Sequence, residues 1–126
     1  MPGSAVYLLV ELTIHEGQLD TFKGIAQEMI AGSRREPGAL AYEWYLSRDQ
    51  KRCRLIETYA SADHVRAHFT GPVVQTLVPR LLQHATLNRL EVYGDPGPQA
   101  AAMLAGFGAE TFGRWAGLTP LSASAS

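Results

Sequence analysis

Apolar residues along this chain switch between a period of two, which is typical of strands, and a period near 3.6, which is typical of helices. Residues 5–14 have the first period, which predicts a strand with Val6, Leu8, Val10, Leu12 and Ile14 on one face and Tyr7, Leu9, Glu11 and Thr13 on the other. Residues 39–47 and 52–59 alternate in the same way around a polar turn, which predicts a β-hairpin. Residues 86–93 form the last predicted strand of this series.

Helical spacing dominates the segments between these strands. A first helix is predicted from the apolar positions Leu19, Phe22, Ala26, Met29 and Ile30, and it ends before Pro37. Ser61 is a suitable N-cap for a second helix that continues to about Phe69. Pro72 can begin a further helical stretch, in which Pro79 kinks or restarts the helix.

The resulting element order, βαββαβ, predicts an α+β ferredoxin-like fold. In that fold a four-stranded antiparallel sheet carries both helices on one face. Large apolar and aromatic side chains nevertheless occupy both faces of the first two predicted strands, so a monomer would expose one apolar sheet face. A second copy packed sheet to sheet would cover it, and we expect a homodimer.

The residues after the last predicted strand form a separate segment. We predict a domain over residues 1–94 and a C-terminal extension over residues 95–126. Residues 99–105 are rich in alanine and should form a helix. Four large apolar residues follow, so the extension should pack on the domain or on the dimer partner, and residues 122–126 should be frayed; the four are Phe107, Phe112, Trp115 and Leu118.

The composition argues against several classes of function. A chain of 126 residues with a formal net charge of -1 and no basic stripe has no electrostatic footprint for nucleic acid. The single cysteine, Cys53, cannot form an intrachain disulfide. The N-terminus resembles no signal peptide, and no apolar stretch approaches the roughly 20 residues of a membrane helix. We therefore expect a soluble cytoplasmic protein without nucleic-acid or membrane partners.

The segment from Glu57 to His68 concentrates the groups that could carry chemistry. Histidine has an ordinary pKa of about 6.5, so His68 could act as a general base toward a phenolic hydroxyl, or could be a hydrogen-bonded core residue. His64 and His68 have the i, i+4 spacing of a metal-binding pair, but only Glu57 offers a further ligand, and we expect no metal site. Glu57 itself lies among apolar residues and must either line a pocket or accept a structural hydrogen bond.

Aromatic residues of the predicted hairpin could form the walls of a ligand site. Trp44, Tyr42 and Tyr45 offer flat surfaces for stacking on an aromatic ligand, although core or dimer packing would use the same residues. Glu11 could be a pocket acid or a charge at a dimer interface. No glycine-rich segment lies between a strand and a helix as a phosphate loop would, so nucleotide binding is not indicated.

Ordered landmarks in residues 5–94 resemble the antibiotic biosynthesis monooxygenase (ABM) family. Glu16-Gly17-Gln18 resembles the family's turn after the first strand, and Glu36-Pro37-Gly38-Ala39-Leu40-Ala41-Tyr42 resembles its start of the second strand. Glu57, Tyr59 and Ser61 resemble its Glu-x-Trp-x-Ser pattern, with Tyr59 in place of Trp. His68 matches a frequent helix histidine, whereas Val73 stands where many members carry a second one.

The resemblance implies a dimeric α+β barrel and a monooxygenase that works without cofactor or metal. The substrates would be molecular oxygen and a small aromatic quinol or polyketide-like phenol, with His68 as the catalytic base. Trp44, Tyr42, Tyr59, Glu57 and His64 would contact the aromatic substrate. A non-catalytic dimeric protein that binds a hydrophobic metabolite is the alternative, and haem binding and degradation is a third reading.

Overall fold

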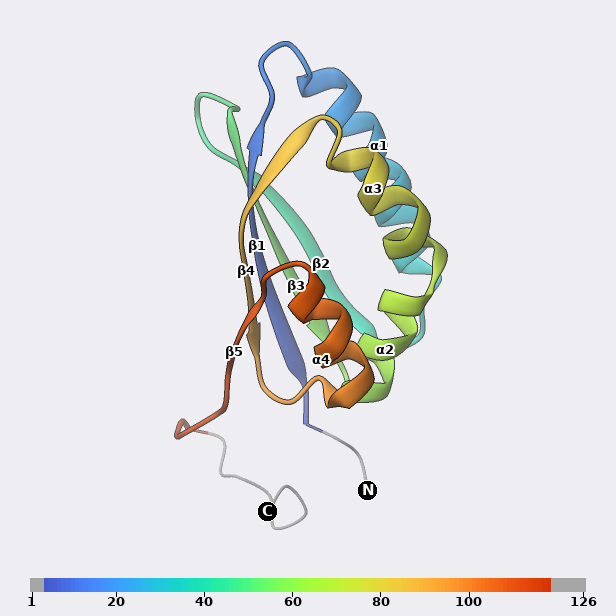
Figure 1. Cartoon of the computed structure of the whole chain (residues 1–126), viewed down its shortest axis with the longest axis vertical. Helices are drawn as coiled ribbons and strands as arrows, with labels where there is room; N and C mark the ends of the chain where they lie inside the picture. The colour runs from blue at the N-terminus through green and yellow to red at the C-terminus, as the bar shows by residue number, and fades with distance from the viewer. Residues whose placement is uncertain (1–3, 119–126) are drawn as a thin grey trace.

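A mixed sheet of five strands is covered by helices on one face (Figure 1). The computed structural model describes residues 4–118 of the chain. The strands lie in the order β2-β3-β1-β4-β5. They are β1 (Val6–Ile14), β2 (Ala39–Leu46), β3 (Arg52–Tyr59), β4 (Ala85–Tyr93) and β5 (Glu110–Phe112). The helical elements are α1 (Leu19–Arg34), α2 (Ala62–Thr70), the π-helical turn η1 (Val73–Leu77), α3 (Val78–Leu81) and α4 (Gly97–Gly106).

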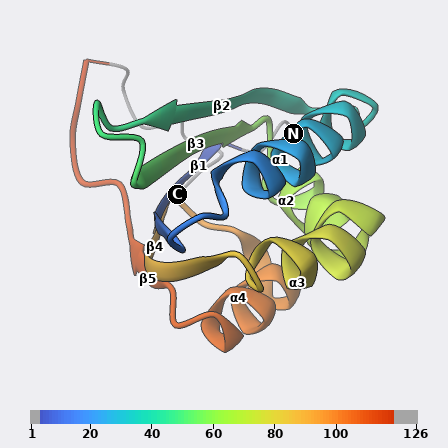
Figure 2. The ribbon, with the colours of Figure 1, turned by 90° about the horizontal axis from the view of Figure 1, so that it is seen from above.

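The predicted ferredoxin-like order is confirmed, with β1 at the centre of the sheet. β1 pairs antiparallel with β3 on one side and with β4 on the other. Its side chains divide as predicted, since Val6, Leu8, Leu12 and Ile14 are buried beneath the helices. Tyr7, by contrast, is 48% exposed on the opposite, open face. Figure 2 shows all the helices on the same side of the sheet.

Helix α1 is continuous despite its internal glycines. A Cβ atom at Gly32 would lie 2.6 Å from the Cγ2 atom of Val73, so this glycine lets α1 approach η1 closely. The helical run after Pro72 divides at the π-helical turn, where the Val78 amide donates to the Val73 carbonyl. Pro79 has no amide hydrogen and occupies the first turn of α3, which agrees with the predicted restart.

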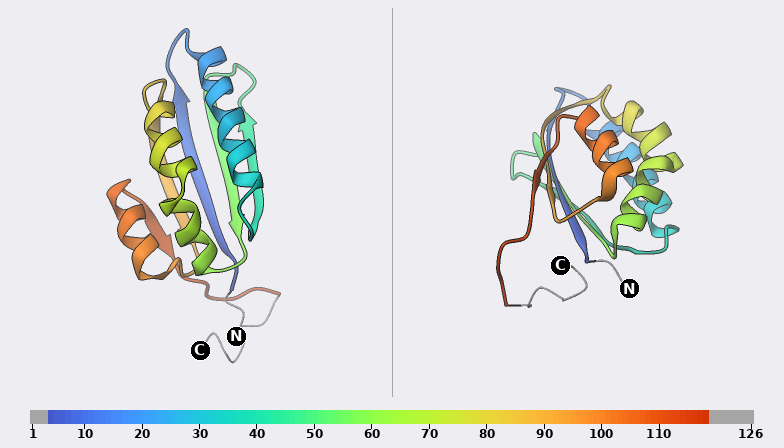
Figure 3. Two further views of the ribbon diagram at one scale, coloured as in Figure 1. Left: turned by 90° about the vertical axis from the view of Figure 1, so that its right-hand side faces the viewer. Right: turned by 60° about the horizontal axis from the view of Figure 1, so that its bottom comes forward.

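The prediction of four antiparallel strands is wrong, because β5 adds a fifth strand parallel to β4. The Gly94 amide also donates to the Phe112 carbonyl at 2.9 Å. Only three residues form β5, too few for a period to be read from the sequence. The extension is therefore a helix followed by a strand, and α4 packs against α2 (Figure 3). The frayed end predicted for residues 122–126 lies outside the described residues.

Two hydrophobic clusters form the core between the sheet and the helices. One surrounds Leu8, Tyr59 and Phe69, and the other surrounds Leu12, Phe22 and Met29. Half-buried Val10, Val78 and Leu87 pack against both clusters. The side chains that face the boundary between the clusters form the candidate site. None of the helices in residues 4–118 is long and apolar enough to cross a membrane.

Candidate functional site

A small cavity of about 60 Å³ lies between the sheet and the helices, where the two core clusters meet. Three of its lining residues, Tyr42, Glu57 and His68, carry polar groups, and we name them the polar end of the cavity. The remaining lining residues are apolar: Val10, Leu12, Met29, Leu55, Phe69, Val74, Val78, Leu81, Leu82, Leu87, Leu90 and Phe107. A polar ligand group would therefore find partners at one end only.

His68 is buried on α2 and is held by Glu36, which follows the end of α1. The His68 Nδ1 atom lies 2.6 Å from the Glu36 Oε1 atom. The local sequence explains how Glu36 reaches this place, because Pro37 cannot continue the helix and Gly38 turns the chain with φ of +83°. A Cβ atom at Gly38 would also collide with the His64 ring. The Pro-Gly turn thus brings a carboxylate of one helix end against an imidazole of another helix.

Glu57 faces the other ring nitrogen of His68. Its Oε1 atom lies 3.6 Å from His68 Nε2 and accepts a hydrogen bond of 2.6 Å from the Tyr59 hydroxyl. Burial raises the pKa of the Glu57 carboxyl above its ordinary value, and the charge of His68 and the Tyr59 hydrogen bond oppose this rise. The imidazole therefore lies between two carboxyl groups, of which the inner one is almost wholly buried.

Tyr42 places a phenol next to this imidazole. Its ring centroid lies 5.7 Å from that of His68, and it is directly opposite Glu57 in the register of β2 and β3. Burial, followed by the negative charge of Glu57, raises the pKa of Tyr42 well above its ordinary value. The same two causes raise the pKa of Tyr59. Both phenols therefore remain protonated at neutral pH, and Tyr42 can donate a hydrogen bond into the cavity.

Trp44, Tyr59 and His64 do not line the cavity, although the sequence suggested all three as substrate contacts. Trp44 is half-buried and packs edge to face against Phe22 and Tyr42, beside the second core cluster. Tyr59 is fully buried and acts on Glu57 through its hydroxyl. The His64 Nδ1 atom lies 2.9 Å from the Ser61 hydroxyl, outside the cavity. The geometry thus brings together Tyr42, Glu57 and His68 and leaves the other predicted contacts in supporting positions.

Sequence reasoning missed Glu36 and Phe107 as members of the site. Glu36 was recognisable only as part of the Glu-Pro-Gly landmark, and it lies 32 positions before His68. Phe107 looked like a packing residue of the extension, but its side chain lines the cavity. Glu36 could have been found from its position directly before the Pro-Gly turn, because such a turn fixes where the carboxylate points.

The described residues show no group of three or more His, Cys, Asp or Glu side chains arranged to hold a metal ion. The ring of His64 is turned toward Ser61, and that of His68 toward the two glutamates. Burial raises the pKa of the Cys53 thiol to about 11, so the thiol stays protonated at neutral pH.

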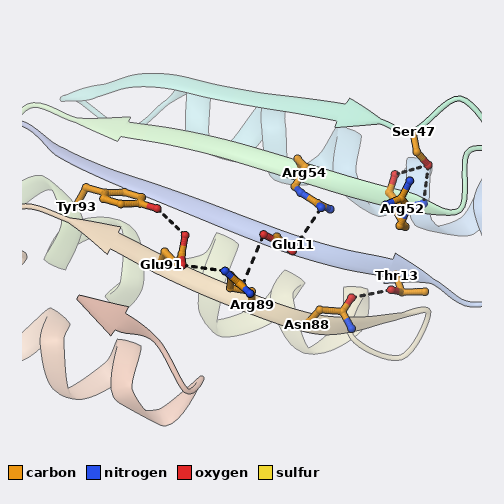
Figure 4. Close-up of polar contacts among 9 residues, drawn as sticks. All are labelled: Glu11, Thr13, Ser47, Arg52, Arg54, Asn88, Arg89, Glu91 and Tyr93. Atoms are coloured by element: carbon orange, nitrogen blue, oxygen red, sulfur yellow. Dashed lines mark hydrogen bonds and ion pairs between the residues drawn. The ribbon is translucent and has the colours of Figure 1, made fainter. Parts of the chain in front are cut away.

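A second group of polar side chains lies on the open face of the sheet (Figure 4). Glu11 is 3.4 Å from Arg54 and 3.8 Å from Arg89, measured between side-chain oxygen and nitrogen atoms. Arg89 also pairs with Glu91, which accepts a hydrogen bond of 2.5 Å from the Tyr93 hydroxyl. We name these five residues the open-face cluster. Its arginine side chains are 40% and 60% exposed, unlike the buried groups of the cavity.

Comparison of the whole sequence with protein-family profiles identifies the family. The sequence profile of the antibiotic biosynthesis monooxygenase family matches residues 5–80, which is more than half of the chain. The protein belongs to the ABM family. No curated protein is a significant match to the chain.

Several solved structures have the same fold as this chain. MupZ from Pseudomonas fluorescens is 22% identical with a TM-score of 0.77, and the match covers 94% of this chain and 96% of MupZ. SnoaB from Streptomyces nogalater, a cofactor-independent oxygenase, is 18% identical with a TM-score of 0.66, covering 76% of this chain and 97% of SnoaB. Rv0793 from Mycobacterium tuberculosis is 20% identical with a TM-score of 0.64, covering 75% and 98%. At these identities the likeness establishes the fold.

These structures differ in how much of this chain they match. The matches to SnoaB and Rv0793 span almost all of those proteins but leave about a quarter of this chain unmatched. That quarter is about as long as the segment that follows β4. MupZ matches nearly the whole chain.

Proposed function

We propose that this ABM protein is a cofactor-independent monooxygenase acting on a small aromatic quinol or polyketide-like phenol. One observation carries the proposal: a buried imidazole held between two carboxyl groups at the polar end of an apolar cavity. The ABM domain comprises residues 1–94 in this proposal, and residues 95–126 form the extension. Family membership and the described oxygenase activity of SnoaB add support.

His68 would accept the phenolic proton of the substrate. When Nδ1 donates its hydrogen to Glu36, the neutral ring carries its lone pair on Nε2, which is the nitrogen nearer to Glu57. A substrate hydroxyl bound beside this atom could pass its proton to Nε2, and the Glu36 carboxylate would stabilise the imidazolium that forms. Tyr42, which stays protonated, would donate a hydrogen bond to the substrate oxyanion.

The electrons would come from the substrate itself. The deprotonated substrate transfers an electron to molecular oxygen, and recombination forms a bond between a ring carbon and oxygen. The resulting hydroperoxide loses water to leave a carbonyl group at that carbon. One oxygen atom thus enters the product and the other leaves as water. The two hydrogens of that water are the phenolic proton, which the imidazolium of His68 returns to the peroxide, and the hydrogen of the oxidised ring carbon, and the substrate supplies all the electrons. The apolar lining would keep bulk water from the reactive intermediates.

The cavity must widen when a substrate enters. Its volume of about 60 Å³ is below the roughly 300–1,000 Å³ of ordinary ligand pockets. Val78 and Leu82, on the helical side of the lining, are only half-buried. Small movements of these side chains would enlarge the space without breaking strand pairing.

The oxygen dependence of product formation tests the proposed reaction. Purified protein would be incubated with a panel of hydroquinones and anthrones under air and under nitrogen, and product formation would be followed. We expect oxygen-dependent acceleration that His68→Ala lowers about 10²- to 10⁴-fold, the usual contribution of a positioned acid or base. His64→Ala is the matched control, because that histidine lies on the same helix outside the cavity. No acceleration by the wild type, or an undiminished rate in His68→Ala, would refute the assignment.

A binding protein without catalysis is the second candidate, because the cavity lining is apolar apart from its polar end. Such a protein would hold a hydrophobic metabolite with one hydroxyl or carbonyl group toward Tyr42 and His68. A ligand that co-purifies with the protein and is never turned over would favour this function. Mass spectrometry of the extracted protein would detect it.

The open face supports the proposal of a homodimer. Tyr7 is 48% exposed and Ile56 is 42% exposed on this face, and both lie next to the open-face cluster on β1 and β3. A second copy would cover these side chains, and two-fold symmetry would let each charged cluster meet its counterpart. Light scattering after gel filtration should give twice the chain mass for the wild type and a monomer for Ile56→Arg. A wild-type monomer at micromolar concentration would contradict the dimer.

A further inference from the structure

Phe107 differs from the other cavity-lining residues because it comes from the extension. Among the lining residues of the described chain, it alone follows β4. It lies directly after α4, which is anchored by the buried side chains of Ala100 and Leu104. The Phe107 amide donates to the Leu104 carbonyl at 2.9 Å, and its ring centroid lies 6.5 Å from that of Phe69. A docked helix thus holds this ring beside the residue that follows His68.

The burial pattern indicates where the cavity opens. Phe107 is half-buried, and so are Val78 and Leu82 on the helical side and Leu87 on β4. Val10 on β1 and Tyr42 on β2 are the other half-buried lining residues. Lining residues deeper in the core, such as Leu12 and Met29, are only 2% exposed. We define the mouth as the place between Phe107, Val78, Leu82 and Leu87, the half-buried lining residues that lie outside β1 and β2. Figure 3 shows α4 beside α2, on the β4 side of the sheet.

The strand register gives the cavity a direction. Tyr42 and Leu8 both pair with Glu57, so the polar end lies at this level of the sheet. Val10 pairs with Leu55 and Leu90 two residues further along β1, and Leu12 pairs with Leu87 beyond them. The lining therefore extends roughly 13 Å along β1 from the polar end to the apolar level of Leu12, at about 3.3 Å per residue.

We propose that Phe107 is the gate of this cavity and the residue that limits substrate size, selecting phenols with a single ring. This inference rests on the proposed function, since it concerns the same cavity, and it narrows the substrate class. A one-ring phenol could pass the Phe107 ring with its hydroxyl toward His68 and its apolar substituents toward Leu12 and Leu87. The Phe107 ring narrows the mouth, so a rigid fused second ring would have to displace it in order to enter a cavity that must already widen from about 60 Å³ for one ring.

Equilibrium binding of phenol and 2-naphthol tests the gate without any turnover. Affinities would be measured under nitrogen by ligand-observed NMR for the wild type, Phe107→Ala and Phe107→Trp. In Phe107→Ala we expect the affinity for 2-naphthol to rise about tenfold relative to that for phenol, within the range that one pocket group contributes to discrimination. The larger ring in Phe107→Trp should weaken both ligands. Phe112→Ala is the matched control, because Phe112 stacks on Tyr93 and lines no part of the cavity.

Several results would overturn the gate. An unchanged ratio of affinities in folded Phe107→Ala, an equal change in Phe112→Ala, or no binding of either phenol to any variant would each do so. Circular dichroism would show whether Phe107→Ala is folded. If it is not, the test uses Phe107→Trp alone, and unchanged affinities for phenol and 2-naphthol in that variant would contradict the proposal. A changed ratio in a protein that shows no oxygen-dependent turnover would support the gate and refute the oxygenase, so the two failures are distinguishable.

Discussion

The charged groups at the cavity and those around Glu11 on the open face of the sheet differ in how far they are buried. On the helix-covered face the side chains of His68 and Glu57 are 3% and 5% exposed, and each has a partner within the protein. On the open face the Arg89 and Glu11 side chains are 60% and 23% exposed, and solvent screens their pairing. The comparison shows that carboxylates of similar chemistry can serve different purposes in one small sheet.

Burial makes the difference between these two sets of groups. A carboxylate transferred from water into an apolar interior must find hydrogen bonds or an opposite charge, and its pKa rises when compensation is incomplete. Glu57 follows this rule through its contacts with Tyr59 and His68. The proposed proton transfer would therefore use groups of the covered face. The proposed dimer would use the open-face cluster.

Removing His68 should have the largest effect on stability. His68→Ala leaves the carboxyl groups of Glu36 and Glu57 without their shared partner, and leaving a buried polar group without a hydrogen-bond partner costs about 1–3 kcal/mol. We expect the free energy of unfolding in urea at pH 7 to fall by an amount in this range. A loss below about 1 kcal/mol would mean that the imidazole contributes no more than an exposed charge and would remove the contrast between the faces.

Glu57→Gln should change how stability depends on pH. Because burial raises the Glu57 pKa above its ordinary 4.5, the folded chain holds this proton more tightly than the unfolded chain. The stabilising contribution is thus complete below pH 4.5 and is lost as pH rises through the folded pKa. A pKa difference of one between the two states corresponds to about 1.4 kcal/mol.

The free energies of unfolding in urea of the wild type and of Glu57→Gln, measured between pH 4 and 8, check this prediction. The wild type should lose stability relative to Glu57→Gln as the pH rises. Parallel curves, or a wild type that gains relative stability with rising pH, would show that the Glu57 carboxyl is not penalised by its surroundings.

Glu11→Gln should have the smallest effect. Exposed ion pairs contribute about 0–1 kcal/mol, so loss of the contacts to Arg54 and Arg89 should change unfolding by less than 1 kcal/mol in dilute protein. Added salt should reduce even this difference. If a second copy covers the open face, the effect will grow with protein concentration, and a concentration-independent loss of several kcal/mol would contradict both expectations.

Much of the fold could be predicted because strand and helix periods are local. The alternation in β1 correctly placed Leu8 and Leu12 on the covered face, and Pro79 marked the start of α3. β5 could not be predicted, since its three residues carry no period and its pairing depends on the free edge of β4. Local patterns therefore reveal long elements and miss short ones that tertiary pairing creates.

The candidate site was only partly predictable for a similar reason. Glu57 and His68 share one strand-to-helix segment, so their proximity could be expected from the sequence. Glu36 comes from the end of another helix, and nothing local shows that its carboxylate meets the imidazole of His68. His64 lies one helical turn before His68, so the sequence suggested that the two rings would face the same way. The ring of His64 instead contacts the Ser61 hydroxyl.

Imidazole ¹⁵N NMR of the protein under nitrogen, with and without phenol, tests the central claim most directly. We expect Nδ1 of His68 to carry a proton in the free protein, because a carboxylate oxygen of Glu36 lies 2.6 Å away and can only accept a hydrogen bond. Saturating phenol should shift the Nε2 signal while Nδ1 stays protonated. An unprotonated Nδ1, or ring signals that phenol leaves unchanged while open-face residues such as Tyr7 respond, would contradict a reactive site in the covered cavity.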